Sequence, residues 1–388
     1  MSSTDRVATQ RAVLERFPET GKLASAALAT LICLPPVVVI ALAFFPAENI
    51  WPHLLATVLP DYVVNTLLLM LGVAVGTLLI GVSTAWFVTH YDFPGRAILT
   101  WALLLPFAYP SYVIAYLYTD LLEYAGPLQS ATRAVFGWQS ARDYYFPSIR
   151  SLGGATLMMI LVLYPYVYLL ARAAFLEQSS SVLDAARLLG SKPWSRFFRI
   201  ALPMARPAIV VGVAMALMET LNDFGTVDYF AVRTLTSGIY DVWLGMGNLG
   251  GGAQIASLLL VFVVVLIALE KSSRRKQAHY QPSGSQVKRL QRQRPEKRTQ
   301  YLLLALCTLP VLTGFVIPSV VLLSYAIDNF TSSWTPEFRR IAWSSISLSA
   351  IAAAVTVLVG VLLSYSKRIY QSKRLHAWIN LSLSLIHI

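Results

Sequence analysis

The sequence predicts an all-α integral membrane protein with about eight membrane-spanning helices. Hydrophobic residues make up 56% of its 388 residues and charged residues only 13%. A soluble domain carries about twice that share of charge. The charges gather between long apolar runs, many of which exceed the ~20 residues that a helix needs to cross a bilayer. Since every backbone polar group inside lipid needs an internal partner, such runs favour helices.

Eight segments have the length and composition of spans, and each ends at turn-forming or charged residues. They are residues 23–45, 65–88, 97–118, 153–176, 208–230, 254–270, 301–326 and 343–365. Cys33 and Cys307 lie inside such runs, far from any His or second Cys. We therefore expect two apolar, buried thiols, and assign neither a disulfide nor a metal site.

The distribution of Lys and Arg predicts that the N-terminus is cytoplasmic. Residues 1–22 hold four Lys or Arg, residues 46–62 hold none, and residues 271–300 hold ten against the single acid Glu296. Because basic residues accumulate on the inner side, residues 1–22 form a cytoplasmic tail and residues 271–300 a basic cytoplasmic linker. Basic residues confined to loops between spans indicate contact with membrane lipid and argue against nucleic acid as a partner. The long loop at 119–152, with three Arg, is the exception.

A weak internal repeat indicates two related units. Residues 65–86 can be laid over residues 344–365 so that Gly81 falls on Gly360. The order of a proline-bearing span, an outer loop, a small-residue span and a basic turn also recurs. Residues 23–270 would then be a first unit of six spans. Residues 301–388 would be a partial second unit with two spans and the start of a third, so we expect the natural protein to continue beyond residue 388.

Between the fourth and fifth spans the sequence predicts two short amphipathic helices. Gly190 ends the first helix, since glycine readily takes a left-handed conformation, and Pro193 suits the first turn of the second. Pro203 and Pro207 mark the entry to the fifth span. Apolar residues recur at helical spacing in both helices, namely Val182, Ala185, Ala186 and Leu189, then Trp194, Phe197, Phe198 and Ala201.

This segment resembles the E-A-A…G…I-x-L-P loop of ABC importer permeases of the binding-protein-dependent type. The matching residues are Asp184, Ala185, Ala186, Gly190, Ile200, Leu202 and Pro203. Asp184 stands where Glu is usual and keeps the carboxylate. The resemblance implies a type I importer fold, with a coupling loop at 177–207 that docks into a cleft on a separate ATPase subunit. The alternative is an amphipathic helix pair that rests on the lipid surface.

The chain has no G-x-x-x-x-G-K-[ST] phosphate loop, and Gly21-Lys22 is followed by Leu23. We therefore expect no cofactor on this chain, no enzymatic activity of its own, and ATP on the partner. The resemblance implies an ATPase dimer, a soluble extracytoplasmic substrate-binding protein, and a location in the bacterial inner (plasma) membrane as a multi-pass protein.

Acids in the fifth span are the first candidates for a translocation pathway. Glu219, Asp223 and Asp228 lie at membrane depth, where acids are costly and mark a pathway or a structural pairing. Glu219 and Asp223 are four residues apart and are expected on one helix face, with Gly225 allowing a local break. Tyr109 and Tyr112 of the third span could line the same path or belong to an interfacial belt. Trp86 and His90 are interpreted as interface anchors.

Residues 218–226, which read M-E-T-L-N-D-F-G-T, resemble the two-unit permeases of the ferric iron importer group. That resemblance implies ferric iron as the substrate, although permeases for thiamine, phosphonate or polyamine share the architecture. A secondary active transporter with two related halves, using Glu219 and Asp223 as ion sites, is the other class of function. It does not account for the spacing of the coupling loop. A membrane-embedded enzyme is disfavoured because the His residues are scattered.

Overall fold

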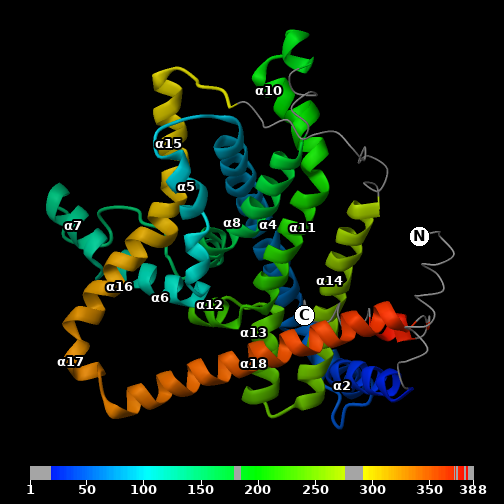
Figure 1. The fold of residues 1–388 in the computed structure, drawn as a ribbon. Coiled ribbons are helices and arrows are strands. Elements are labelled where there is room, and N and C mark those ends of the chain that lie inside the picture. Colours follow the sequence, from blue (N-terminus) through cyan, green and yellow to red (C-terminus); the bar gives the residue numbers. More distant parts are fainter. Residues whose placement is uncertain are drawn as a thin grey trace, which may run out of the picture. The chain divides into compact units, whose positions relative to one another are not determined.

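The computed structural model describes residues 19–178, 185–275, 292–370, 372, 375–379 and 382. Within them the chain is helical, and its one β-feature is an isolated bridge between Tyr91 and Gln293. The chain divides into two compact units, Ala47–Ser324 and a smaller one formed by Met1–Pro46 with Tyr325–Ile388 (Figure 1). The predicted all-α class is confirmed.

The larger unit contains α-helices, a 3-10 turn (η1) and three π-helical turns (η2, η3 and η4). Its last helix, α16, extends beyond Ser324, where the unit ends. In chain order these are α3 (Trp51–Ala56), α4 (Leu59–His90), α5 (Arg96–Ala102), η1 (Leu105–Ala108), α6 (Ser111–Leu122), α7 (Pro127–Phe136), α8 (Leu152–Glu177), α10 (Pro193–Arg196), η2 (Phe197–Ala201), α11 (Leu202–Asn222), α12 (Phe224–Tyr229), α13 (Leu235–Tyr240), η3 (Asp241–Gly245), α14 (Leu249–Arg275), α15 (Lys297–Val311), η4 (Leu312–Val316) and α16 (Ile317–Asp328).

In the smaller unit α2 (Glu19–Phe44) packs on α18 (Pro336–Ile369), with the short α17 (Phe330–Ser333) preceding α18. Ala29 and Leu363 are fully buried in this contact. The Ser25 hydroxyl donates to Ser366 Oγ at 2.7 Å. This pair joins the first and last predicted spans.

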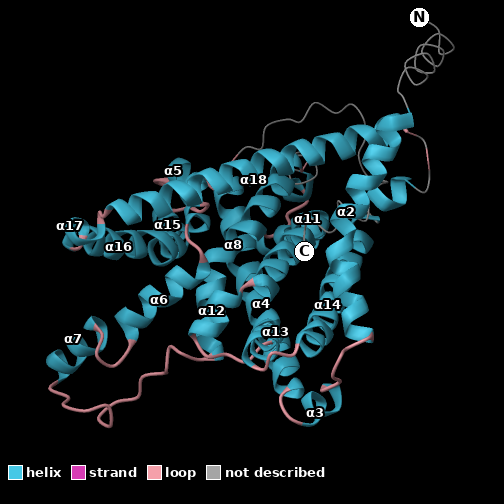
Figure 2. Cartoon of the chain, turned by 90° about the horizontal axis from the view of Figure 1, so that it is seen from below, coloured by secondary structure: helices cyan, strands magenta, loops and turns pink. Residues whose placement is uncertain are grey.

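Helix α8 packs against both α4 and α11, which also contact each other, at the centre of the larger unit (Figures 1 and 2). Glycines on both neighbours face Val167 of α8. A Cβ atom on Gly81 of α4 would lie 2.7 Å from Val167 Cβ, and one on Gly212 of α11 would lie 2.8 Å from Val167 Cα. Both are shorter than any real contact, so the two glycines are what permits this close approach.

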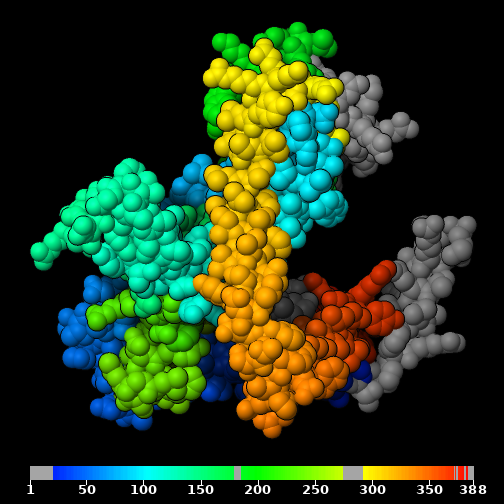
Figure 3. Space-filling model, turned by 90° about the vertical axis from the view of Figure 1, so that its left-hand side faces the viewer, coloured from blue at the N-terminus to red at the C-terminus, as the bar shows by residue number. Residues whose placement is uncertain are grey.

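Helix α15, which follows the basic linker, packs on α4 and α5, and Figure 3 shows it in yellow against the cyan α5. Leu303 and Cys307 of α15 are buried there. Just before it, the backbone N–H of Gln293 donates to His90 O, and that of Asp92 donates to Gln293 O, both at 2.8 Å. Contacts therefore group α15 with the helices that precede the linker. The division at 271–300, inferred from the repeat, stays a prediction.

Seven described helices are long and apolar enough to cross a membrane, and a broken eighth candidate occupies the third position. There the segments Arg96–Ala108 and Ser111–Phe136 meet at 91°. The third predicted span, 97–118, is therefore broken into two helical segments. The cause is Pro110, since proline forces the preceding Tyr109 into an extended conformation (ψ 131°) and supplies no N–H to continue a helix.

The observed helix differs at both ends from the fifth predicted span, 208–230. Helix runs without a gap from Pro193 to Asn222, so Pro203 and Pro207, expected to mark the entry to the span, lie inside a continuous helix. In the π-turn η2 the Leu202 N–H bonds to Phe197 O, five residues back, immediately before Pro203. The helix then stops at Asn222, so the rest of the predicted span is a separate short helix, α12.

Candidate translocation cavity and coupling segment

A cavity of about 550 Å³ lies where the broken third span faces α8 and the end of α11. Its two carboxylates come from Glu219 and Asp223. The lining comprises Phe107, Ala108, Tyr109, Pro110, Ser111, Tyr112, Val162, Leu163, Tyr166, Glu219, Asn222, Asp223, Phe224 and Gly225. Four of the five predicted pathway residues therefore come together. The exception is Asp228, which is exposed on α12.

Asp223 is held by the backbone that it caps. Its Oδ1 accepts the Thr226 N–H at 2.7 Å, and its Oδ2 accepts the Thr226 hydroxyl at 3.0 Å and the Ser111 hydroxyl. It is the N-cap of α12, with φ −75° and ψ 97°. Glu219 and Asp223 therefore do not share one helix face, and the break predicted at Gly225 lies at Asp223. A carboxylate with three donors joins α12 to the start of α6.

Glu219 has a different environment in the last turn of α11. Its side chain is exposed at the cavity, and it has no hydrogen-bond or ion-pair partner among the described residues. Of the two acids in the lining, Glu219 is therefore the one whose carboxylate is not held by a hydrogen bond or ion pair from the described residues. Three or more potential metal ligands do not come together within the described part of the chain.

Aromatic residues form much of the cavity wall. The Tyr109 hydroxyl lies 2.9 Å from Ser319 Oγ of α16. Tyr112 packs over Gly225, where an added Cβ would lie 3.0 Å from Tyr112 Cβ. Tyr166 of α8, which the sequence analysis missed, meets Phe107 with ring centroids 4.5 Å apart. Nothing in the sequence around Tyr166 distinguishes it from a tyrosine in a belt at the membrane interface.

The coupling segment, defined here as residues 185–203, begins with a short helix and a tight turn. Residues 185–188 are helical, and Gly190 follows with φ +76°. The Gly190 N–H bonds to Arg187 O at 2.9 Å and the Ser191 N–H to Ala186 O at 3.0 Å. This pair of bonds is a Schellman motif, which confirms that Gly190 ends the helix. Asp184 and Val182 lie outside the described residues.

Large apolar side chains stand in solvent around this turn. Leu188 is 90% exposed, Leu189 87% and Trp194 74%. In the second helix only part of the predicted apolar stripe faces outward, since Phe197 is half-buried and Ala201 is buried. Of the residues matched to the importer motif, Ile200 and Leu202 are half-buried and Pro203 is exposed. The Gln178 amide, buried at the end of α8, donates to Ala201 O at 2.8 Å and ties the segment to the bundle.

Trp86 and His90 do not lie at an exposed interface as predicted. They are 8% and 6% exposed, and their rings stack with centroids 3.5 Å apart. Phe175 of α8 and Phe197 of η2 pack on Trp86 at 5.3 and 5.0 Å. We call these four residues the aromatic cluster. The prediction was wrong because Trp and His at the end of a span are typical of the membrane interface, whereas here both side chains face the protein interior.

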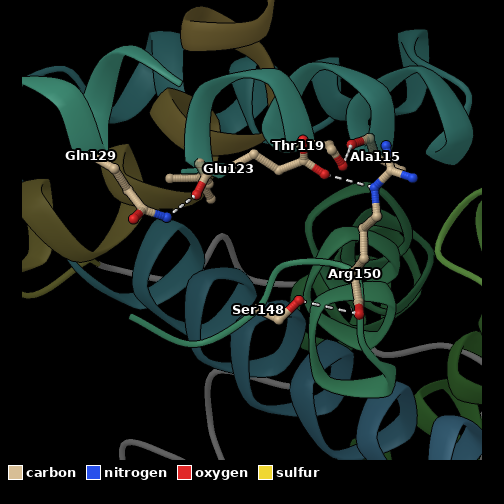
Figure 4. Close-up of polar contacts among 7 residues, drawn as sticks. Ala115, Thr119, Glu123, Gln129, Ser148 and Arg150 are labelled. Atoms are coloured by element: carbon tan, nitrogen blue, oxygen red, sulfur yellow. Dashed lines mark hydrogen bonds and ion pairs between the residues drawn. The ribbon is translucent and has the colours of Figure 1, made fainter. Parts of the chain in front are cut away.

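The predicted 119–152 loop contains the helix α7 and a set of polar contacts (Figure 4). Glu123 pairs with Arg150 Nε at 2.7 Å. The amide of Gln129, 6% exposed, donates to Leu122 O at 2.7 Å. These contacts hold the end of α6 beside the start of α8, and so help to fix the broken third span that lines the cavity.

Comparison with known proteins shows that the chain is similar in sequence to transport permeases. The chain is 30% identical over 196 residues to the molybdenum transport system permease protein ModB of Escherichia coli K12, covering 48% of this chain and 82% of that protein. It is 30% identical over 204 residues to the sulfate transport system permease protein CysW of the same organism, covering 52% of this chain and 66% of that protein.

Among solved structures, a bacterial alginate ABC transporter in complex with a periplasmic protein bound to an alginate pentasaccharide matches with a TM-score of 0.49 and 17% identity, over 65% of this chain and 90% of that one. The family model that describes the inner membrane component of binding-protein-dependent transport systems matches residues 77–278, which include the cavity and the coupling segment. The chain therefore belongs to the family of inner membrane components of binding-protein-dependent transport systems.

Proposed function

We propose that the chain is the transmembrane permease subunit of an ABC importer, and that its coupling segment docks onto a separate ATPase subunit. The observation that carries this proposal is the group of exposed apolar side chains around the left-handed Gly190. Leu188, Leu189 and Trp194 are too exposed to stabilise this chain, and a large exposed apolar patch indicates an interaction site. Two short helices that present such residues fit a groove on a protein partner.

In this proposal the N-terminus and the coupling segment lie in the cytoplasm, and a soluble binding protein delivers the substrate to the opposite side. ATP binding and hydrolysis take place on an ATPase dimer. The permease supplies a two-state element whose equilibrium the nucleotide shifts through the coupling segment. The cavity then opens alternately to the two sides of the membrane.

For the cargo we propose a cation, with ferric iron as the specific candidate. The described lining contains the carboxylates of Glu219 and Asp223 and no Lys, Arg or His. Two like unit charges about 4 Å apart repel by about 4 kcal/mol at an effective dielectric constant of about 20, and a dianion doubles this. An acidic lining therefore disfavours a dianion such as sulfate or molybdate, which the names of the relatives suggest, and favours a cation.

The docking proposal is tested with Leu189→Asp, which places a charge on the exposed patch. Since Leu189 is 87% exposed, the variant should fold like the wild type but should no longer co-purify with the ATPase subunit. Tyr145→Asp is the matched control, because Tyr145 is 91% exposed on the loop that follows α7. Unchanged binding of the ATPase to Leu189→Asp would refute docking through this patch. Binding to lipid vesicles in place of the ATPase would favour the lipid-surface alternative.

A further inference from the structure

The aromatic cluster joins three separate elements at one point. Trp86 and His90 belong to α4, Phe175 to α8 and Phe197 to the π-turn η2. The Trp86 ring stacks on His90 at 25° and meets Phe175 edge-on at 74°. Phe197 lies 5.0 Å from Trp86. The separations of Phe175 and Phe197 from Trp86, 5.3 and 5.0 Å, are in the range of favourable aromatic pairs, so η2 packs directly onto α4 and is joined to α8 through the Trp86 ring.

From Phe197 a chain of ring contacts continues outward to the exposed patch. Phe197 and Phe198 are 4.8 Å apart, and Phe198 and Trp194 are 4.7 Å apart. Trp194 is 74% exposed, Phe198 is 45% exposed, and Phe175 at the inner end is fully buried. The rings thus run without interruption from the proposed docking surface to the core between α4 and α8.

The inner end of this series of ring contacts is linked to the cavity by helix α8. Phe175 is nine residues from Tyr166, which lines the cavity, and at 1.5 Å per residue that separation is about 13 Å along one helix. Close packing of α4 and α11 on α8 at Gly81 and Gly212 leaves little room for α8 to move independently of its neighbours. A displacement of Phe175 would therefore be carried to the cavity wall.

We infer that the aromatic cluster is the mechanical connection between the coupling segment and the cavity, so that Trp86 and Phe197 transmit movement of the ATPase to α4 and α8. This inference rests on the proposed function. The four residues are positioning residues, since none of them lines the cavity. Coupling of this kind needs packed side chains with two discrete arrangements, and the π-turn at Phe197 is a type of helix irregularity that is frequent at functional sites.

The test uses the complete importer, with the natural permease, its ATPase and its binding protein in proteoliposomes. Trp86→Leu and Phe197→Leu should still bind the ATPase and allow ATP hydrolysis, but the amount of substrate transported per ATP should fall about fivefold or more. Trp86→Phe keeps a ring in the cluster and should retain most of the coupling. A purely structural role would instead lower assembly and leave the ratio of transport to hydrolysis unchanged.

Trp101→Leu is the matched control, because Trp101 lies on α5 and is 69% exposed. It should transport as much substrate per ATP as the wild type. If Trp86→Leu fails to assemble, Phe197→Leu still tests the inference, since Phe197 is only half-buried. Normal transport per ATP in an assembled Leu variant would overturn it. Failure of the wild-type permease to bind any ATPase would refute the proposed function instead.

Discussion

The two carboxylates of the cavity differ in what surrounds them, and this is why we propose Glu219 as the contact for a cargo. Asp223 accepts hydrogen bonds from the Thr226 N–H, the Thr226 hydroxyl and the Ser111 hydroxyl. Glu219 faces the cavity without a partner among the described residues. Asp223 therefore stabilises the break between α11 and α12, and Glu219 is the carboxylate that we propose attracts a cation.

Replacing Glu219 by Gln removes that attraction with little change in shape. We expect cation uptake at low substrate concentration to fall about tenfold, which corresponds to ~1.4 kcal/mol of lost interaction. The measurement is the initial rate of uptake into proteoliposomes. Asp228→Asn, at an exposed acid outside the cavity, should leave the rate near that of the wild type. Equal rates for Glu219→Gln and the wild type would remove Glu219 from the pathway.

Gly190 controls the coupling turn through its backbone. At φ +76° an L-residue costs roughly 1–2 kcal/mol, so Gly190→Ala should weaken binding of the ATPase subunit about fivefold or more. Gly137 is a matched control, because it has φ +72° and, like Gly190, has open space around an added Cβ. Titration of ATPase binding should show a loss for Gly190→Ala and none for Gly137→Ala. Equal losses would mean that the effect is general destabilisation.

At the scale of elements, the packing of α8 between α4 and α11 determines stability. Gly81→Ala would place a Cβ 2.7 Å from Val167 Cβ and 2.9 Å from Tyr168 N. Overpacking of this kind costs about 1–3 kcal/mol, so we expect a lower Tm in detergent. Gly360→Ala on α18 is the control, since nothing lies within 4 Å of its added Cβ. It should leave the Tm unchanged or raise it, because Ala favours helix by about 1 kcal/mol. A Gly81→Ala variant as stable as Gly360→Ala would contradict this packing.

The long helices could be predicted from sequence because hydropathy and length specify them. The expected span at 65–88 is observed as α4 (Leu59–His90), and that at 153–176 as α8 (Leu152–Glu177). The break at Pro110 could not be predicted, because membrane helices often tolerate proline and only the surrounding contacts show whether a helix continues.

The residues of the candidate site could likewise be predicted from the sequence only in part. Gly190 was predictable, since a helix-ending turn depends on neighbouring residues alone. The aromatic cluster was not, because Trp86, Phe175 and Phe197 come from three separate segments and hydropathy carries no information about which helices touch. Glu219 and Asp223 were selected as acids of the fifth predicted span, and both line the cavity. Their different roles follow from hydrogen bonds to Ser111 and Thr226 that no spacing rule predicts.

At the scale of the whole molecule, the larger unit places its two functional features on one scaffold. The cavity is lined by α8 and the end of α11, and the coupling segment leads directly into α11. Membership in the family of binding-protein-dependent inner membrane components agrees with this arrangement. We therefore expect energy to enter through the coupling segment and to be used at the cavity.

The most direct test is to measure what drives uptake by the complete importer in proteoliposomes. With ATP available to the ATPase subunit and substrate-loaded binding protein on the other side, we predict accumulation of ferric iron that stops without ATP and is lost in Leu189→Asp. Sulfate and molybdate should not be taken up. Accumulation that follows a proton gradient, needs no ATP and survives Leu189→Asp would contradict the account and favour a secondary transporter.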